Sequence, residues 1–478
     1  MKFTKTNHTP KLSFISDEQL YEIHMATMEV LERVGVKVSH EKAKEMLRQA
    51  GAYVKGDLVK IPAVMVESAL RTAPKRVVLC NRSGERKLFL EKNNTYYGLG
   101  SDLPWTIDIN TGERRSSTKQ DVINASIILD SLPNYDFMMS FAIATDVPKK
   151  DSYLHQFQAM VEHTSKPIIY TARDGIDFMQ IVEMASIIAG GYEELKQKPF
   201  IACYHEPISP LCHTNEGLSK LLACSKYGIP AVYTPGMGAG GNAPCTAAGL
   251  LTQANAELLS GLVIHQLEVK GAPFIYGGCP SIMDMRSTIF SYGCPEWHMN
   301  SVVLSQMARF YELPIFSTGG CSDSPIFDQQ AGIELGYSIV LAELSGANLI
   351  HDVGYLEAGL TASLESMVVG NEVIGLARRI GKGYEINKET LAVEVMERVG
   401  PGGNYIDDEH TFNNFRNEFW VPQLLNRKRH KDWVEDGGLS LGQRASSMAK
   451  EILLTHKPKP LPDQVKVKLT EIINNAKR

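Results

Sequence analysis

Eight short apolar runs recur along the middle of the chain, and most are followed by a segment with helical periodicity. Near-continuous apolar strands that alternate with helices are typical of a parallel sheet covered on both faces. Eight units over about 290 residues match the number and span of a (β/α)8 TIM barrel, which is the α/β fold that we expect. A doubly wound open sheet is the alternative. The runs cover residues 95–98, 137–143, 167–171, 199–204, 229–234, 272–276, 313–318 and 346–351.

The two ends of the chain follow a different pattern. Near the start, Ser16 and Gln19 form a potential capping box before a helical apolar pattern that Gly35 closes. Shorter helices are expected near 40–50 and 62–72, with a hairpin at 77–80 and 87–90. The last part is polar and helical. We therefore expect an N-terminal helical segment and hairpin at 1–94, a catalytic barrel at 95–385, and a C-terminal helical extension at 386–478.

Composition narrows the functional classes. The net charge of -5 argues against a nucleic-acid partner. The sequence shows no run of about 18 apolar residues, so no membrane span is expected. No apolar core follows the charges of residues 1–5, so a secretory signal is not expected either. The eight cysteines form no Cys-x-x-Cys pair and no disulfide framework, which favours a reducing cytoplasm.

Tyrosines lie at or just after most of the predicted strand ends, where a barrel of this kind carries its site. Strands favour tyrosine, so each one alone has a structural explanation. Together, their rings could surround a quaternary ammonium group, which binds to aromatic faces. The candidate substrate-binding tyrosines are Tyr97, Tyr204, Tyr233, Tyr276 and Tyr355.

Charged residues occur at the same strand ends. Asp102, Glu206 and Asp352 would add negative potential, while Arg173, His205 and His351 could hold an anionic end of the substrate. This mixture suits a zwitterion with a fixed cation and a carboxylate. His351 and Asp352, with Glu206, are the candidate catalytic residues, although a structural role is equally open. His205 has no metal-ligand spacing to Cys203 or Glu206, so no metal is expected.

Two glycine motifs could bring the backbone close to a ligand. Residues 236–241 match G-x-G-x-x-G between a strand and a helix, the pattern of a dinucleotide site. The motif sits in the fifth unit, and Glu257, at the right offset for a ribose ligand, falls inside a helical pattern. Close backbone approach is therefore the favoured interpretation. The candidate cofactor-binding glycines are Gly236, Gly238, Gly319 and Gly320.

Several strings resemble the trimethylamine methyltransferase family. They are residues 317–323, 328–332, 345–350 and 353–357, with Asn371 and Glu372 downstream. The resemblance implies a barrel that transfers a methyl group from a methylamine to the Co(I) of a separate corrinoid protein. Trimethylamine-specific members contain pyrrolysine, whereas this chain has standard residues only. The resemblance therefore implies the non-pyrrolysine branch, which acts on quaternary amines such as glycine betaine, proline betaine or carnitine.

The expected function is thus methyl transfer from a quaternary amine, glycine betaine first, to a corrinoid carried by a cognate protein. We expect no cofactor tightly bound by this chain; the acceptor is the cob(I)alamin of the partner. A homo-oligomer is also expected, because apolar helical segments lie at both ends. The alternatives are a barrel oxidoreductase or lyase that binds a nucleotide or phosphate at residues 236–241, and a betaine-binding module without catalysis.

Overall fold

The computed structural model describes residues 11–476. Residues 1–5, on which the expectation about a secretory signal rests, lie outside the described residues. Seven parallel strands form one sheet in the order β6-β17-β16-β14-β12-β10-β9. They are β6 (Tyr96–Tyr97), β9 (Ile168–Thr171), β10 (Ile201–His205), β12 (Ala231–Tyr233), β14 (Phe274–Gly277), β16 (Ile315–Thr318) and β17 (Leu349–His351).

A very short eighth strand closes this sheet into a ring. Phe137 forms a parallel bridge with Gly98, and Met138 forms one with Ile168 at the start of β9. The amide of Asp136 donates to the carbonyl of Tyr97 at 2.7 Å, and that of Ile169 to Met138 at 2.9 Å. The predicted (β/α)8 barrel is therefore confirmed, and the open doubly wound sheet is wrong.

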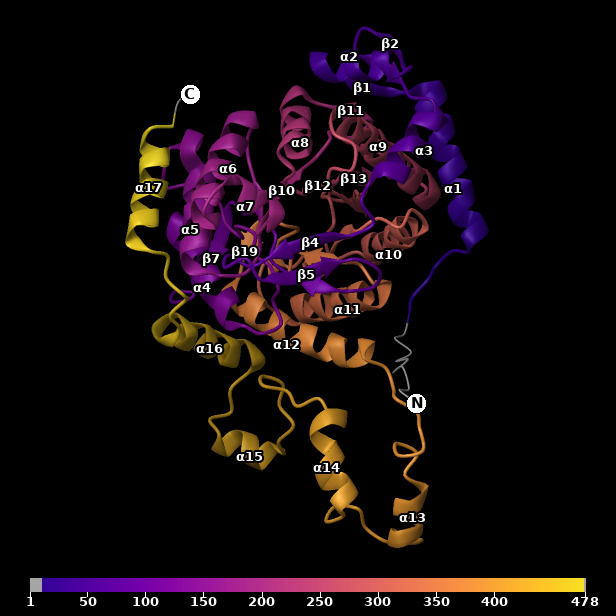
Figure 1. The fold of residues 1–478 in the computed structure, drawn as a ribbon. Coiled ribbons are helices and arrows are strands. Elements are labelled where there is room, and N and C mark those ends of the chain that lie inside the picture. Colours follow the sequence, from indigo (N-terminus) through magenta and orange to yellow (C-terminus); the bar gives the residue numbers. More distant parts are fainter. Residues whose placement is uncertain (1–10, 477–478) are drawn as a thin grey trace.

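Helices cover the outside of the barrel (Figure 1). One follows each strand: α4 (Lys119–Ser131), α5 (Ser152–His163), α6 (Gly175–Ala189), α8 (Asn215–Tyr227), α9 (Ala247–Glu268), α10 (Pro295–Phe310), α11 (Gln329–Ser345) and α12 (Leu364–Gly381). The short α7 (Tyr192–Gln197) follows α6. By length and composition α9 could cross a membrane, contrary to the expectation from sequence, but 72% of its most apolar window is buried in the protein. It is therefore a core helix.

Inward-pointing apolar side chains and the N-terminal hairpin fill the amino-terminal half of the barrel interior. Ile169, Ala202, Val232, Ile275 and Leu349 point inward and form one apolar cluster. The predicted hairpin, β4 (Val77–Cys80) and β5 (Arg86–Leu90), adds buried apolar side chains to this cluster and plugs the amino-terminal ends of the strands. Side chains of the opposite parity point outward to the helices. The carboxyl ends of the strands are left as the mouth.

Two small sheets lie after the strand ends. One pairs β13 (Gly236–Ala239) with β15 (Cys279–Ile282) in parallel. The other has the order β18-β19-β7-β8 and consists of β18 (Tyr355–Leu356), β19 (Thr361–Ala362), β7 (Trp105–Ile107) and β8 (Arg114–Ser116). Both extend the loops that follow barrel strands, so they fix the backbone around the mouth.

The N-terminal elements pack against the barrel helices. The capping box of Ser16 and Gln19 begins α1 (Asp17–Glu29), as expected, and a π-helical turn (Val30–Val34) continues it to Gly35. β1 (Val36–Val38), α2 (Glu41–Gln49), β2 (Tyr53–Lys55), β3 (Leu58–Lys60) and α3 (Ala63–Thr72) follow, and β11 (Cys212–His213) joins their sheet. Helices α1, α2 and α3 lie on α9.

The C-terminal extension has two parts. Residues 383–440 form an arm with α13 (Val393–Val399), α14 (Glu409–Glu418) and α15 (His430–Glu435), which project away from the barrel in Figure 1. Between α14 and α15 the amides of residues 423–425 donate to Glu372 of α12 and tie the arm to the body. The chain then returns, and α16 (Leu441–Thr455) packs on α12 and α4, while α17 (Asp463–Asn474) packs on α6 and α5. The domain boundaries at 94/95 and 385/386 stay a prediction.

Candidate active site

Three carboxylates come together at the mouth of the barrel. Asp102 follows β6, Glu206 follows β10 directly, and Asp352 follows β17. Burial raises the pKa of Asp102 to about 6 and also raises the pKa of Asp352. Burial likewise raises the pKa of Glu206, and the negative charges of Asp102 and Asp352 raise it further. Asp102 and Asp352 are therefore both close enough to Glu206 to repel its charge, and a bound cation would relieve that repulsion.

Asp352 lies between two polar partners. Thr318 donates its hydroxyl to Oδ2 of Asp352 at 2.9 Å, and Nε2 of His351 lies 3.2 Å from the same oxygen. Nδ1 of His351 contacts the carbonyl of Ser317 at 2.7 Å, so this nitrogen carries the proton. With the proton on Nδ1, a neutral His351 ring would present the lone pair of Nε2 to Oδ2 of Asp352. The contact is favourable only when a second proton lies between these two atoms. The pair is held in place and buried, with His351 at 4% and Asp352 at 3% exposure.

Glu206 lies deep in the site but remains open to solvent. Its side chain is exposed, although the surrounding protein is dense enough to raise its pKa. Both observations fit a group on the wall of the mouth. Tyr204 donates its hydroxyl to Oε1 of Glu206, and a Cβ on Gly236 would lie 4.0 Å from Oε2. A ligand at Gly236 would therefore meet the Glu206 carboxylate.

Aromatic rings surround the carboxylates. The ring of Tyr204 lies 5.6 Å from that of Phe316 and 6.2 Å from His351. On the other side, the ring of Tyr355 lies 6.1 Å from Phe141 and 6.4 Å from Tyr292. The charges of Asp352 and Glu206 both raise the pKa of Tyr292, after burial, which places its ring near both groups. Aromatic faces beside carboxylates suit a cation that has no hydrogen to donate.

The backbone around the mouth is strained. Asp102 has a φ of 65°, Phe141 of 62° and Asp352 of 74°, a region that few residues other than glycine adopt. Such conformations cost free energy and concentrate at functional sites. Gly100 is required by close packing, since a Cβ there would lie 2.2 Å from the Tyr355 hydroxyl and 2.3 Å from Oδ1 of Asp352. The backbone that holds these carboxylates is therefore strained, which lowers the stability of the fold.

Few cations offset the three carboxylates. Lys220 donates to the carbonyl of Ala172 at 2.7 Å, and its charge lowers the pKa of Asp102 and Glu206 against the larger effect of burial. Arg173 does not serve this role, because it pairs with Asp174 at 3.0 Å and lies 3.7 Å from Asp177. The mouth therefore keeps an excess of negative charge.

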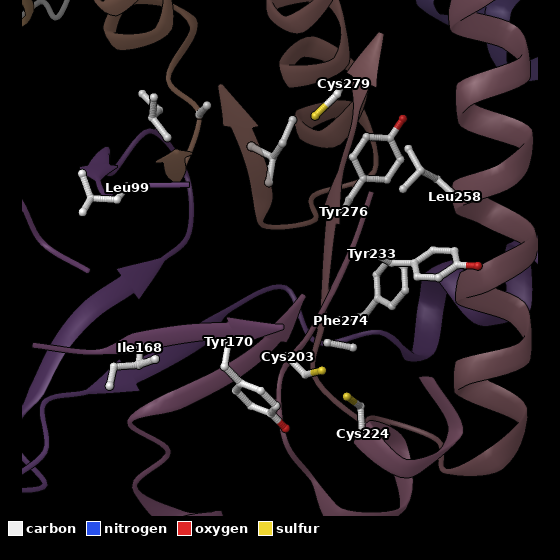
Figure 2. Packing of buried hydrophobic residues seen from close by; sticks show 14 of the residues in the cluster. Leu99, Ile168, Tyr170, Cys203, Cys224, Tyr233, Leu258, Phe274, Tyr276 and Cys279 are labelled. Atoms are coloured by element: carbon white, nitrogen blue, oxygen red, sulfur yellow. The ribbon is translucent and has the colours of Figure 1, made fainter. Parts of the chain in front are cut away.

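Four of the residues proposed from sequence for substrate binding face away from the mouth. The hydroxyl of Tyr97 donates to Glu343 on α11 at 2.8 Å, that of Tyr233 contacts His213 at 2.6 Å, and that of Tyr276 donates to Asn255 on α9 at 3.0 Å. Figure 2 shows Tyr233 and Tyr276 turned toward the helix that carries Leu258. His205 also faces outward, with its ring 5.2 Å from that of Tyr233.

The expectation that these side chains converge on the mouth is therefore wrong. Strand residues alternate between the interior and the helices, and these four have the outward parity. Tyr204 has the inward parity, and Tyr355 reaches the mouth from a loop, with its hydroxyl 2.6 Å from the carbonyl of Ser101.

The glycine motif at 236–241 does not form a nucleotide loop. Its first residues are the strand β13, and α9 begins only at Ala247 behind the cap Thr246. No helix start is therefore presented at the glycines, as a dinucleotide site requires. Glu257 is buried and accepts from Ser209 at 2.7 Å and from the Leu211 amide at 2.8 Å. Gly238 lies beside Met283, and Gly320, with a φ of 83°, lies against Val353. Gly319 packs on Ala342 and Ile350.

Several residues of the mouth carry no functional signal in the sequence. Phe141 and Phe316 lie inside predicted strands, and Thr318 lies at a predicted strand end. Tyr292 belongs to a long loop after β15 that carries no strand signal. The polar and aromatic composition of residues 288–293 could have indicated it.

Comparisons with known proteins identify the family of this chain. The sequence pattern of the family "Trimethylamine methyltransferase (MTTB)" matches residues 2–478. The chain is 33% identical to trimethylamine methyltransferase MttB of Desulfitobacterium hafniense, over 97% of this chain and 94% of that protein. It is 30% identical to a glycine betaine methyltransferase from another strain of that species, over 97% of both.

A solved structure supports the fold independently. The monomethylamine methyltransferase of Methanosarcina barkeri superposes with a TM-score of 0.51, at 11% identity, over 98% of this chain and 96% of that chain. This likeness concerns the fold alone. The match of the family pattern and of these relatives over nearly the whole length shows that the chain belongs to the trimethylamine methyltransferase family.

Proposed function

We propose that this methyltransferase takes a methyl group from a quaternary amine, glycine betaine first, and delivers it to the Co(I) of a corrinoid on a separate protein. One observation carries the proposal: Asp102, Glu206 and Asp352 meet among aromatic rings at the open end of the barrel. A relative named glycine betaine methyltransferase aligns over 97% of the chain.

The chemistry fits residues that mainly orient the substrate. A quaternary nitrogen leaves as a neutral tertiary amine, so no group has to protonate it. The corrinoid of the partner supplies the nucleophile. The protein has to hold one N–CH3 bond in line with that nucleophile at near-attack distance. Since the positive charge of the substrate disperses in the transition state, only partial anionic compensation favours the reaction.

The residues of the mouth then divide by role. Tyr204 and Tyr355 offer aromatic faces, and Asp102 and Glu206 face the cation. His351 and Asp352, which hold each other, position the polar wall, and no proton has to move between them and the substrate. The same division adds Phe141 and Tyr292 to the aromatic wall.

Arg286 is the proposed partner for the substrate carboxylate. Within the described residues its guanidinium makes no hydrogen bond or ion pair, and its side chain is exposed in the loop after β15. The three candidates that the sequence analysis names for this role are engaged elsewhere: Arg173 in ion pairs, His351 with Ser317 and Asp352, and His205 on the outer face.

An apolar rim around the mouth suits the corrinoid protein. Five large apolar side chains, between 45% and 71% exposed, lie in loops that follow barrel strands. Loops that follow barrel strands lie at the same face of the barrel, and exposed apolar surface gathered on one face marks an interaction site. Because the rim surrounds the strand ends, a protein docked there would bring its corrinoid to the mouth. The rim consists of Ile208, Met285, Ile289, Ile326 and Leu360.

A second copy of the chain is the proposed partner of the arm at 383–440. Helices α13, α14 and α15 contain no buried residue. The arm leaves the end of α12 where Arg378 pairs with Asp136, which precedes the eighth barrel strand, so it begins at the end opposite the mouth. A protein docked at the rim would leave the arm uncovered. Its most exposed apolar residues, from 64% to 79%, are Tyr384, Ile386, Val393, Ile406, Phe412, Phe419 and Val421.

Sedimentation tests this self-association. We expect wild type to sediment as an oligomer at micromolar concentration, and Ile406→Asp with Phe412→Asp to sediment as a smaller species. A monomeric wild type would contradict the proposal.

The eight cysteines form no disulfide, which supports the proposed cytoplasmic location.

Methyl transfer to free cobalamin tests the function itself. Reduced cob(I)alamin is incubated anaerobically with the protein and, separately, with glycine betaine, proline betaine, carnitine or trimethylamine. We expect the methylcobalamin spectrum to grow with a quaternary amine, glycine betaine first. Transfer from trimethylamine alone, or from none of the four by correctly folded protein, would contradict the proposal.

A further inference from the structure

A cluster of metal-ligating side chains lies on the outer face of the barrel, behind the wall of the mouth. Cys203 and His205 are two residues apart on β10 and share its outward face, and Cys224 lies opposite them on α8. One ligand atom of each lies within 4.8 Å of those of the other two. None of the three is more than 2% exposed. Figure 2 shows the sulfur atoms of Cys203 and Cys224 turned toward one another.

The hydrogen bonding of this cluster is incomplete. The two ring nitrogens of His205 and the hydroxyl of Tyr170 are buried, and within the described residues none of them makes a well-formed hydrogen bond; the polar neighbour of both side chains is the Cys203 thiol. The Tyr170 hydroxyl lies beside the Cys203 thiol and so belongs to the same cluster. Buried polar atoms are almost always satisfied in folded proteins. An imidazole whose buried nitrogens meet thiols and no oxygen or nitrogen partner therefore points to a ligand shared by these side chains.

We propose that Cys203, His205 and Cys224 bind a divalent transition metal, zinc first. Two thiolates and an imidazole are a ligand set that zinc prefers, and a tetrahedral site leaves one position for the Tyr170 hydroxyl or a water molecule. Binding places the metal on the two sulfurs and one ring nitrogen and releases the two thiol protons to solvent. A disulfide between Cys203 and Cys224 would give the His205 ring no partner, whereas a metal would bind both sulfurs and a nitrogen of His205.

The position of the cluster indicates a structural metal. The ligands are buried, and none of them faces the mouth. Cys203 and His205 alternate along β10 with Tyr204 and Glu206, which point to the opposite side. A metal that joins β10 to α8 would fix the strand end that carries these two mouth residues. This inference does not depend on the identity of the methyl donor.

Metal content and cobalt spectra of the full-length protein test the proposal. The protein is purified under reducing conditions, stripped with a chelator, titrated with Zn²⁺ or Co²⁺ and dialysed. We expect one metal per chain and, with Co²⁺, the intense bands of tetrahedral cobalt together with thiolate-to-cobalt charge transfer. The Cys224→Ser variant should lose the metal, while Cys80→Ser, which removes an equally buried strand thiol elsewhere, should retain it.

Three results would overturn the proposal. They are protein that retains no metal after titration, metal that Cys224→Ser retains at full stoichiometry, and a Cys203–Cys224 disulfide found by mass spectrometry in reduced preparations. If Cys224→Ser does not fold, the cobalt spectrum of wild type decides, since charge-transfer bands appear only when sulfur binds the metal.

Discussion

Replacing Glu206 with glutamine isolates the charge of one mouth carboxylate. Glutamine has the same shape, and its amide oxygen can still accept the hydroxyl of Tyr204 that now contacts Glu206. The substitution therefore removes a negative charge with little change in packing. In the proposed binding mode, the cation then loses one of the two carboxylates that face it.

The expected loss of affinity follows from electrostatics. A cation held about 5 Å from a carboxylate gains about 3 kcal/mol at an effective dielectric constant of about 20. Because Glu206 is open to solvent, screening reduces this to about 1–2 kcal/mol. The dissociation constant should therefore rise roughly 5- to 30-fold, since about 1.4 kcal/mol corresponds to tenfold.

Calorimetric titration at pH 8 measures this change. Glycine betaine is compared with 3,3-dimethylbutanoate, which replaces the charged nitrogen by carbon and keeps the carboxylate. We expect Glu206→Gln to weaken only the cationic ligand. The matched control is Glu216→Gln, which removes the same charge from an exposed position on α8 and should change neither. Equal weakening of both ligands, or unchanged betaine affinity, would refute the reasoning.

Three further predictions concern the walls of the mouth. Tyr204→Leu should weaken glycine betaine binding by about 0.5–2 kcal/mol and leave the melting temperature unchanged. Tyr276→Ala opens a cavity at a fully buried ring and should lower the free energy of unfolding by about 3–5 kcal/mol. Calorimetry measures the binding and chemical denaturation the stability; the reverse pattern would show that Tyr276 faces the mouth. Burial raises the pKa of Asp102 to about 6, so betaine affinity should fall as the pH drops through about 6 and Asp102 takes up a proton. The Asp102→Asn variant should show no such pH dependence. The Asp102 carboxyl faces Lys220, Tyr153 and Glu206, so a pH dependence that persists in Asp102→Asn would assign the titration to another group. Gly100→Ala would place a Cβ 2.2 Å from the Tyr355 hydroxyl and should reduce methyl transfer at least tenfold, while Gly175→Ala, whose Cβ meets only Ser219 at 3.6 Å, should leave the rate unchanged; equal rates for the two variants would show that the mouth tolerates the displacement.

Much of the fold is predictable from local sequence. Each of the eight apolar runs contains a barrel strand or, at Phe137 and Met138, the bridges that close the ring. The capping box at Ser16 and the hairpin at residues 77–90 also form as expected. These features depend on neighbours within a few residues, so hydrophobic periodicity and cap chemistry are sufficient to indicate them.

The candidate site was predictable only in part. Asp102, Tyr204, Glu206, His351, Asp352 and Tyr355 were identified because they follow strands, and strand ends meet at one face of a barrel. Tyr97, Tyr233, Tyr276 and His205 satisfied the same criterion and yet face the helices. A strand buried on both sides has apolar residues in both directions, so its sequence carries no signal of which side chains point inward.

The sequence by itself therefore determined the order of strands and helices, the barrel class and the family. Tertiary structure alone decided which alternate side chains of each strand point into the barrel, because that choice depends on how eight strands close into one ring. It also brought Tyr292 from a distant loop and placed Cys224 opposite Cys203 and His205. Contacts between residues far apart in the chain depend on the packing of whole elements, and no local pattern of residues encodes them.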